Sequence, residues 1–106
     1  MKPVEFRGDS LARLRDFPPI ARRAAGYQLD RVQRGLAPDD WKPMQSIGPG
    51  VRELRLRDRG GVFRVIYLAA LPDRIVVLHA FQKKSPRTAR HDIDLAANRL
   101  RELRRD

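Results

Sequence analysis

The sequence predicts an α+β fold, with a small curved antiparallel sheet, an α-hairpin on one face of the sheet and a helix at the C-terminal end. Two observations carry this prediction. Helical apolar periodicity is confined to the two ends of the chain, and three β-type runs separated by short turns lie between them. The 106 residues suit one compact domain, residues 1–106, with a single core.

The N-terminal part predicts a strand and a helical hairpin. Residues 2–6 are β-leaning, and residues 8–19 contain a short helix that Asp9 or Ser10 can cap before two prolines end it. The second helix spans residues 19–36 and stops at a glycine near its end. Its apolar stripe, at helical spacing, consists of Ala21, Ala25, Leu29, Val32 and Leu36.

The middle of the chain predicts a loop followed by an antiparallel meander. Residues 37–50 contain three prolines and two glycines, which favours a loop that Trp41 and Met44 pin to the core. Three strand-like runs with short turns between them follow, at residues 51–57, 62–71 and 75–81. The second run is almost wholly apolar and therefore predicts a central strand that is buried on both faces.

The C-terminal segment, residues 85–106, predicts the last helix. Ser85 can cap it with Pro86 in the first helical position, and an alternative start lies at Thr88. The apolar positions recur at helical spacing and are Ile93, Ala96, Ala97, Leu100 and Leu103.

The charge balance points to a polyanionic partner. The net charge is +10, from 23 lysines and arginines against 13 acidic residues, and arginine forms bidentate pairs with phosphate. The alternative is an ordinary solvated surface rich in arginine. The chain has no cysteine, which excludes disulfides and thiolate sites, and no apolar run of membrane-spanning length. We therefore expect a soluble cytoplasmic protein that does not contact membranes.

Arg64 is the unusual residue of the central strand, because a charge in so apolar a run is costly unless it is paired or open to a groove. One interpretation is an ion pair with Glu53 or Asp58. The other is a guanidinium on a sheet face that the helices leave uncovered. Arg55 and Arg57 point away from the leucine side of the preceding strand and can share that face.

Further candidates follow the last strand. Lys83 and Lys84 lie just beyond the strand that ends in Phe81, so separate cationic segments can line one concavity, with Phe81 available for base stacking. Such a site suits a phosphodiester, and RNA can be cut by its own 2′-OH given a base, an acid and cations for the developing charge. A lysine with a lowered pKa can serve in proton transfer.

The two histidines are weaker candidates for that chemistry. His79 lies in a buried-looking strand and is read as a core histidine, and His91 lies beside Asp92 at the start of the last helix. Two histidines without cysteine give no metal-site spacing, and no phosphate-loop or dinucleotide motif is present. We predict neither a metal nor a cofactor.

Four motifs carry a family resemblance: "ELR" before the hairpin turn, "FRVIY" in the central strand, "LHAFQKK" in the next strand and "DIDLAANRL" in the final helix. Together they make the chain resemble the RelE/ParE superfamily of type II toxins, in particular the HigB-like, phage-derived branch. The resemblance implies a RelE-like fold and a toxin that cuts translated mRNA on the ribosome. It also implies a cognate antitoxin, typically of the helix-turn-helix type. Because the superfamily includes gyrase-directed toxins, inhibition by binding and a non-catalytic nucleic-acid-binding module remain alternatives.

The resemblance also assigns roles to residues. Arg64 matches the strand arginine that contacts the scissile phosphate, and Lys83 and Lys84 match a basic pair that acts in proton transfer or charge stabilisation. The best-studied RelE proteins use a C-terminal tyrosine, which "RTARHD" lacks here. The expected RNA-binding residues are Arg55, Arg57, Phe81, Arg87, Arg90 and His91.

Overall fold

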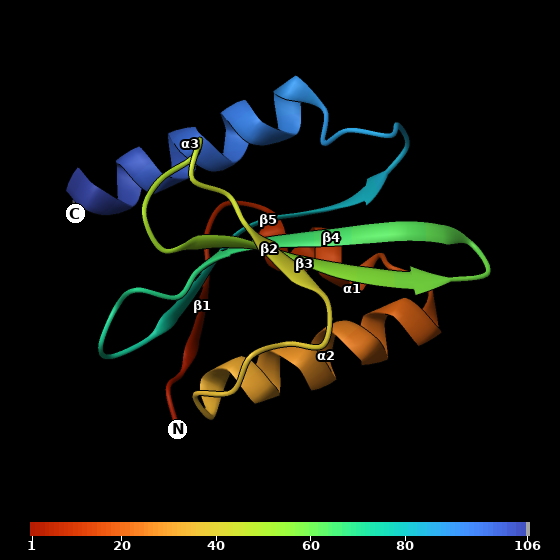
Figure 1. Ribbon diagram of the computed structural model, residues 1–106, viewed down its shortest axis with the longest axis horizontal. Helices are drawn as coiled ribbons and strands as arrows, with labels where there is room; N and C mark the ends of the chain where they lie inside the picture. The colour runs from red at the N-terminus through yellow and green to blue at the C-terminus, as the bar shows by residue number, and fades with distance from the viewer. Residues whose placement is uncertain (106) are drawn as a thin grey trace.

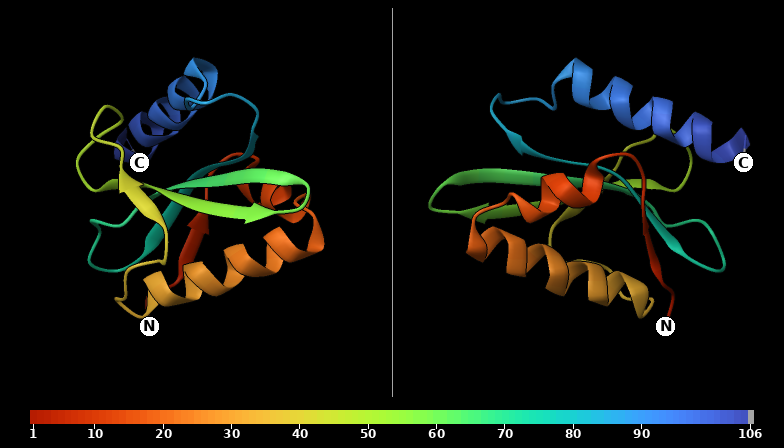
Figure 2. Two further views of the ribbon diagram at one scale, coloured as in Figure 1. Left: turned by 45° about the vertical axis from the view of Figure 1, so that its right-hand side comes forward. Right: turned by 180° about the vertical axis from the view of Figure 1, so that it is seen from behind.

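The computed structural model describes residues 1–105, and its centre is a five-stranded sheet that lies between helices on its two faces (Figure 1). The elements in chain order are β1 (Val4–Phe6), α1 (Ser10–Arg15), α2 (Pro19–Gln33), β2 (Trp41–Pro43), β3 (Val51–Asp58), β4 (Gly61–Leu68), β5 (Ile75–Lys83) and α3 (Arg90–Arg105). The strand order in the sheet is β1-β5-β4-β3-β2. α1 and α2 cover one face and α3 lies over the other (Figure 2).

The α+β fold class is confirmed, with one difference in strand direction. β2 to β5 are antiparallel, as the short turns predict, but β1 pairs with β5 in parallel, so the sheet is mixed. Parallel neighbours need a long connection. Here the helical hairpin and three strands separate β1 from β5, which supplies that length.

β2 is a strand where the sequence predicted only loop. Trp41 pairs with Leu54 and Pro43 with Arg52, which places β2 at the edge of the sheet. A proline is tolerated on an edge strand because no neighbour requires its missing N–H group. The guanidinium carbon of Arg52 also lies 4.3 Å from the centre of the Trp41 ring, a cation–π contact that fixes this edge.

The first core lies between the helical hairpin and the sheet. The predicted stripe of α2 is buried there, except for Leu36, which lies beyond the end of the helix and is 50% exposed. Gly35 ends the helix with a φ of 82°, which a glycine adopts without strain, and this turn directs Leu36 away from the core. The other members of this cluster are Leu14, Phe17, Leu54, Leu56, Phe63, Val65, Tyr67, Ile75, Val77 and Ala80.

The start of α1 differs from the expected capping. Asp9 occupies the N-cap position, but its side chain makes no capping hydrogen bond and instead accepts one from Arg99 of α3 at 2.6 Å. The Ser10 hydroxyl donates to the carbonyl of Val77 on β5. Both polar side chains therefore join α1 to other elements.

The second core lies between α3 and the opposite face. Ala96, Leu100 and Leu103 of α3 pack there on side chains of the sheet that include Ile66 and Leu78. α3 begins at Arg90, so neither predicted start is right. Ser85 and Thr88 lie in the preceding loop, where their hydroxyls donate to Arg87 O and to Glu53. Within residues 1–105, no helix has both the length and the apolar character needed to cross a bilayer.

Candidate nucleic-acid interface

A β-bulge in β5 decides which of its side chains share a face with Arg64. The register against β4 shifts after Ile66, where β5 contains one extra residue, Leu78. An insertion of this kind reverses the face that the following side chains occupy. As a result, Phe81 lies opposite Arg64, and Lys83, two residues further along, is on the same face.

Strand β3 adds basic side chains to this face. Arg55 is paired with Arg64 across the two strands, and Arg57 lies two residues further along β3. The sequence predicted that these side chains share one face of the sheet, and the register confirms it. α3 covers the other end of this face, over the apolar side chains of the second core.

Glu53 is the centre of a cluster of cations on this face. Its side chain is fully buried, and its Oε1 lies within 4.0 Å of three cationic nitrogens: Arg64 Nε at 3.1 Å, Arg55 Nε at 3.8 Å and Lys42 Nζ at 4.0 Å. A buried carboxylate is costly without such compensation. Asp40 also pairs with Arg55, at 3.9 Å, so three cations and two carboxylates leave one positive charge in excess and the cluster still attracts anions.

Arg64 is buried as well, with 4% of the residue exposed. The ion pair with Glu53, one of the two interpretations of the sequence, is therefore present, whereas Asp58 instead accepts a hydrogen bond from Gly60 N. The second interpretation, a guanidinium on a face that the helices leave uncovered, is compatible with this pair, because Arg64 lies at the end of the face that α3 does not cover and lines a cavity there. Burial lowers the pKa of Arg64 from its ordinary value, and the Glu53 carboxylate opposes this effect. The guanidinium remains protonated at neutral pH.

The loop between β5 and α3 is tied to the same carboxylate. The Thr88 hydroxyl donates a hydrogen bond of 2.7 Å to Oε2 of Glu53, the oxygen atom that does not face Arg64. Glu53 therefore holds both the cations of the sheet and the loop that borders them.

A cavity of about 410 Å³ opens beside this cluster. Lys83 and Lys84 both line it, but they differ in how exposed they are. Lys83 is half-buried on the face of Arg64, whereas Lys84 is exposed. Burial lowers the pKa of the Lys83 ammonium and the Arg64 guanidinium lowers it further, while Glu53 acts in the opposite direction. The residues that line the cavity are Arg57, Val62, Arg64, Lys83, Lys84, Ser85 and Pro86.

His79 is a core histidine, as its strand position suggested. Its Nε2 lies 2.7 Å from Asp92 Oδ1, and only 2% of the residue is exposed. Burial lowers the pKa of His79, whereas the hydrogen bond that the imidazole makes to the Asp92 carboxylate acts in the opposite direction. The imidazole ring stacks on Phe81, with ring centres 4.9 Å apart. Phe81 is itself only 3% exposed, so the platform for base stacking that the sequence suggested is almost entirely covered.

The remaining predicted binding residues lie on or before the first turn of α3. Arg87, Arg90 and His91 are all exposed. The Arg90 guanidinium pairs with Asp94 at 3.1 Å, one turn along the helix, and His91 Nε2 lies 3.4 Å from Asp92. None of the three appears among the side chains that line the cavity beside Arg64.

The sequence analysis missed two participants in this site. Lys42 contributes a cation from β2, which was read as loop, and Thr88 was read as part of a helix. The short Trp-Lys-Pro run could have indicated this role of Lys42. If the run is extended, the lysine side chain points to the opposite face from the side chains of its two neighbours. Among residues 1–105, no group of three or more His, Asp or Glu side chains is arranged to hold a metal ion.

Comparison with known proteins bears out the family resemblance. The family model for phage-derived Gp49-like proteins matches residues 12–101. A mutant of the Escherichia coli toxin RelE, solved in the free state, superimposes with a TM-score of 0.66 over 96% of this chain and 97% of that chain, at 12% sequence identity. At this identity the likeness shows the fold, which is RelE-like. Among curated protein sequences, none matches significantly. The chain belongs to the family of phage-derived Gp49-like proteins.

Proposed function

We propose that this protein is the toxin of a type II toxin–antitoxin system and that it cleaves translated mRNA on the ribosome without a metal ion. The observation that carries the proposal is the convergence of cations from β2, β3, β4 and β5 around Glu53, next to an open cavity. The RelE-like fold and the toxin named in the matching structure support it.

The chemistry uses the RNA itself as the nucleophile. The 2′-oxygen attacks the adjacent phosphorus and forms a new O–P bond, while the P–O5′ bond breaks. The products are a 2′,3′-cyclic phosphate and a 5′-hydroxyl. One proton passes from the 2′-OH to a solvent water and one reaches the leaving O5′, and negative charge grows on the phosphate oxygens in between.

Arg64 and Lys83 are the residues assigned to the reacting phosphate. Arg64 is held by Glu53, so its guanidinium is fixed before RNA binds and stabilises the developing charge without reorganisation. Lys83 shares this face, and its lowered pKa makes proton exchange at neutral pH easier. Its ammonium form protonates the leaving oxygen.

The other cations act on binding. Arg55, Arg57 and Lys84 hold the RNA backbone near the cavity, while Arg87, Arg90 and His91 contact the strand further along. Phe81 supplies an apolar edge rather than a full stacking platform. The net charge of +10 favours an acidic segment of a cognate antitoxin, of the helix-turn-helix type, as the neutralising partner.

The test is primer extension on translated mRNA after induction of the protein in growing cells. Wild type is expected to produce new 5′ ends, and Lys83→Met to reduce their formation by about 100-fold or more. Lys84→Met is expected to retain more cleavage than Lys83→Met. Arg23→Met serves as the matched control, because this exposed arginine lies on α2, away from the site.

The rival functions give different results in the same experiment. Growth arrest with intact mRNA and a DNA-damage response would favour a toxin that binds gyrase. Binding of nucleic acid without growth arrest would favour a non-catalytic module. Either result would refute the nuclease.

A further inference from the structure

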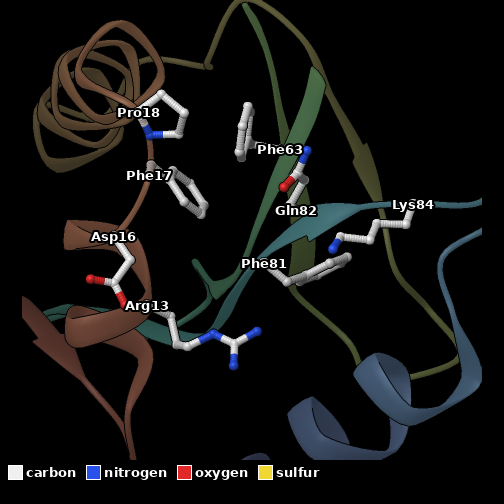
Figure 3. A pocket seen from close by; sticks show the side chains of 8 residues that line it. All are labelled: Arg13, Asp16, Phe17, Pro18, Phe63, Phe81, Gln82 and Lys84. Atoms are coloured by element: carbon white, nitrogen blue, oxygen red, sulfur yellow. The ribbon is translucent and has the colours of Figure 1, made fainter. Parts of the chain in front are cut away.

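A second feature of the molecule lies round the end of β5, away from Arg64. β1 pairs with β5 only as far as Val77, so the edge of β5 beyond this point carries no further strand. A cavity of about 430 Å³ opens there between this edge and the junction of α1 and α2 (Figure 3). Its volume falls in the range of small-molecule pockets. The lining residues are Arg13, Asp16, Phe17, Pro18, Phe63, Phe81, Gln82 and Lys84.

Three phenylalanine rings form the apolar part of the cavity wall, which also carries the polar side chains of Arg13, Asp16, Gln82 and Lys84. The rings of Phe17 and Phe63 are tilted against each other with centres 4.9 Å apart, and the ring of Phe81 is stacked on His79. All three phenylalanines are almost completely buried, so the core holds them in place. A preformed apolar slot of this kind binds a flat ring at little cost in ordering.

One polar group in the cavity has a defined direction. Gln82 Nε2 donates a hydrogen bond of 3.0 Å to the carbonyl of Gly60, which fixes the amide. This bond uses one of the two N–H groups of Nε2 and orients the amide, so that Oε1, the acceptor, lies on the side of the amide nearer Phe17 (Figure 3). A fixed acceptor selects ligands that carry an N–H group at the matching point.

This cavity continues the candidate interface. A cavity of about 370 Å³ at the start of α3 shares Arg13, Phe81, Gln82 and Lys84 with it. That middle cavity also shares Lys83 and Lys84 with the one beside Arg64. Lys84 lines all three, so three adjoining cavities with cations along them follow the chain from Arg64 round the end of β5.

We propose that the cavity between Phe17, Phe63 and Phe81 binds one unstacked nucleobase of the RNA strand, and that Gln82 selects a base with an exocyclic amino group. Arg13 and Lys84 flank the opening and take the adjoining phosphates. Single-stranded bases are recognised in this way, by apolar walls together with hydrogen bonds to the base edge. This inference rests on the proposed function, because that function supplies the RNA strand whose base would enter the cavity.

Cytosine and uracil provide the sharpest test, because they have nearly the same shape. Cytosine presents an amino group at the position where uracil presents an oxygen acceptor. With Gln82 Oε1 as the acceptor, one hydrogen bond distinguishes the two bases, which corresponds to about a fivefold preference for cytosine.

The experiment is a titration of the isotope-labelled protein with the RNA trinucleotides UCU and UUU, followed by NMR. UCU is expected to shift the Gln82 side-chain amide and the Phe63 ring resonances at saturation, with about fivefold tighter binding than UUU. Gln82→Met keeps the length of the side chain and removes the acceptor, so it should bind both trinucleotides equally. Gln45→Met, at an exposed position in another loop, should behave as wild type.

Three results would overturn the inference: no saturable shift at this cavity with either trinucleotide, equal binding of both by wild type, or an undiminished preference in Gln82→Met. Because binding needs no ribosome and no cleavage, the outcome is separate from that of the nuclease test. A protein that leaves mRNA intact but selects cytosine through Gln82 would refute the proposed function and support the base site.

Discussion

The two faces of the sheet bury their side chains by different means. The face under α1 and α2 buries apolar side chains, and adjacent positions such as Leu54 and Val65 are completely buried. The face under α3 is apolar at one end only; at the other end it buries a carboxylate and a guanidinium, Glu53 and Arg64. Buried apolar side chains need only neighbours of complementary shape, whereas buried charged groups need oppositely charged or hydrogen-bonding partners in fixed positions. The second face is therefore the one on which substitutions can separate stability from function.

The largest effect is expected at Glu53, where the second face depends on charge compensation. Glu53→Ala leaves Arg64 buried without its carboxylate and next to Arg55, so we expect a loss of about 3–5 kcal/mol in the free energy of unfolding. Urea denaturation followed by circular dichroism measures it. Glu53→Gln keeps the shape and an acceptor for Thr88, so it should lose less. An unchanged denaturation midpoint for Glu53→Ala would contradict the clustering of cations around this carboxylate.

The neighbouring residue tests the first face. Leu54 is completely buried under the helical hairpin, one position from Glu53 but on the other side of the sheet. Leu54→Ala removes apolar contacts and leaves a cavity, which should cost about 3 kcal/mol. RNA affinity of the folded variant, measured by fluorescence anisotropy at a temperature where it is fully folded, should equal that of wild type. A selective loss of affinity would mean that the two faces are coupled.

A smaller, pH-dependent effect is expected from His79, which joins β5 to α3. The charged groups around it are Asp92 and Arg99 of α3 and Arg13 of α1. Since burial lowers the pKa of His79 in the folded state, the unfolded chain binds a proton first as the pH falls. Stability should therefore decrease below about pH 6.5, the ordinary pKa of histidine, by at most about 1.4 kcal/mol per pH unit.

The control for this effect is His79→Gln, which keeps a side chain able to bond Asp92 and removes the titration. The slope of unfolding free energy against pH between pH 7 and 5 should flatten in this variant relative to wild type. An identical slope in both proteins would show that other groups cause the pH dependence.

The same contrast explains what the sequence could and could not predict. Leucines that alternate along β3, and apolar spacing in α2 and α3, were sufficient to assign the helices, the meander and the apolar faces, because periodicity alone decides which side is buried. The Arg64–Glu53 pair could be offered as one of two readings, since a lone charge in an apolar strand needs a partner.

The position of Lys83 could not be predicted. Counting alternate residues from Val76 would place Lys84, not Lys83, on the face of Arg64. The extra residue Leu78 reverses that order, and a bulge of this kind has no signature in "IVVLHAF". β1 was also placed in an antiparallel sheet because its partner, β5, is distant in sequence and nothing local fixes the direction of pairing.

The smallest effect should separate two arginines of one strand that point to opposite faces. Arg57 is exposed on the face of Arg64, and Arg52 lies on the other face against the Trp41 ring. If Arg57 contacts one phosphate of single-stranded RNA, Arg57→Ala should reduce the slope of log affinity against log salt concentration by about 0.7. Fluorescence anisotropy at several salt concentrations measures this slope. Arg52→Ala removes the same charge, so a change due only to net charge would appear equally in both variants. Equal slopes in the two variants would therefore mean that RNA senses the overall field of the protein and that β3 presents no specific phosphate contact.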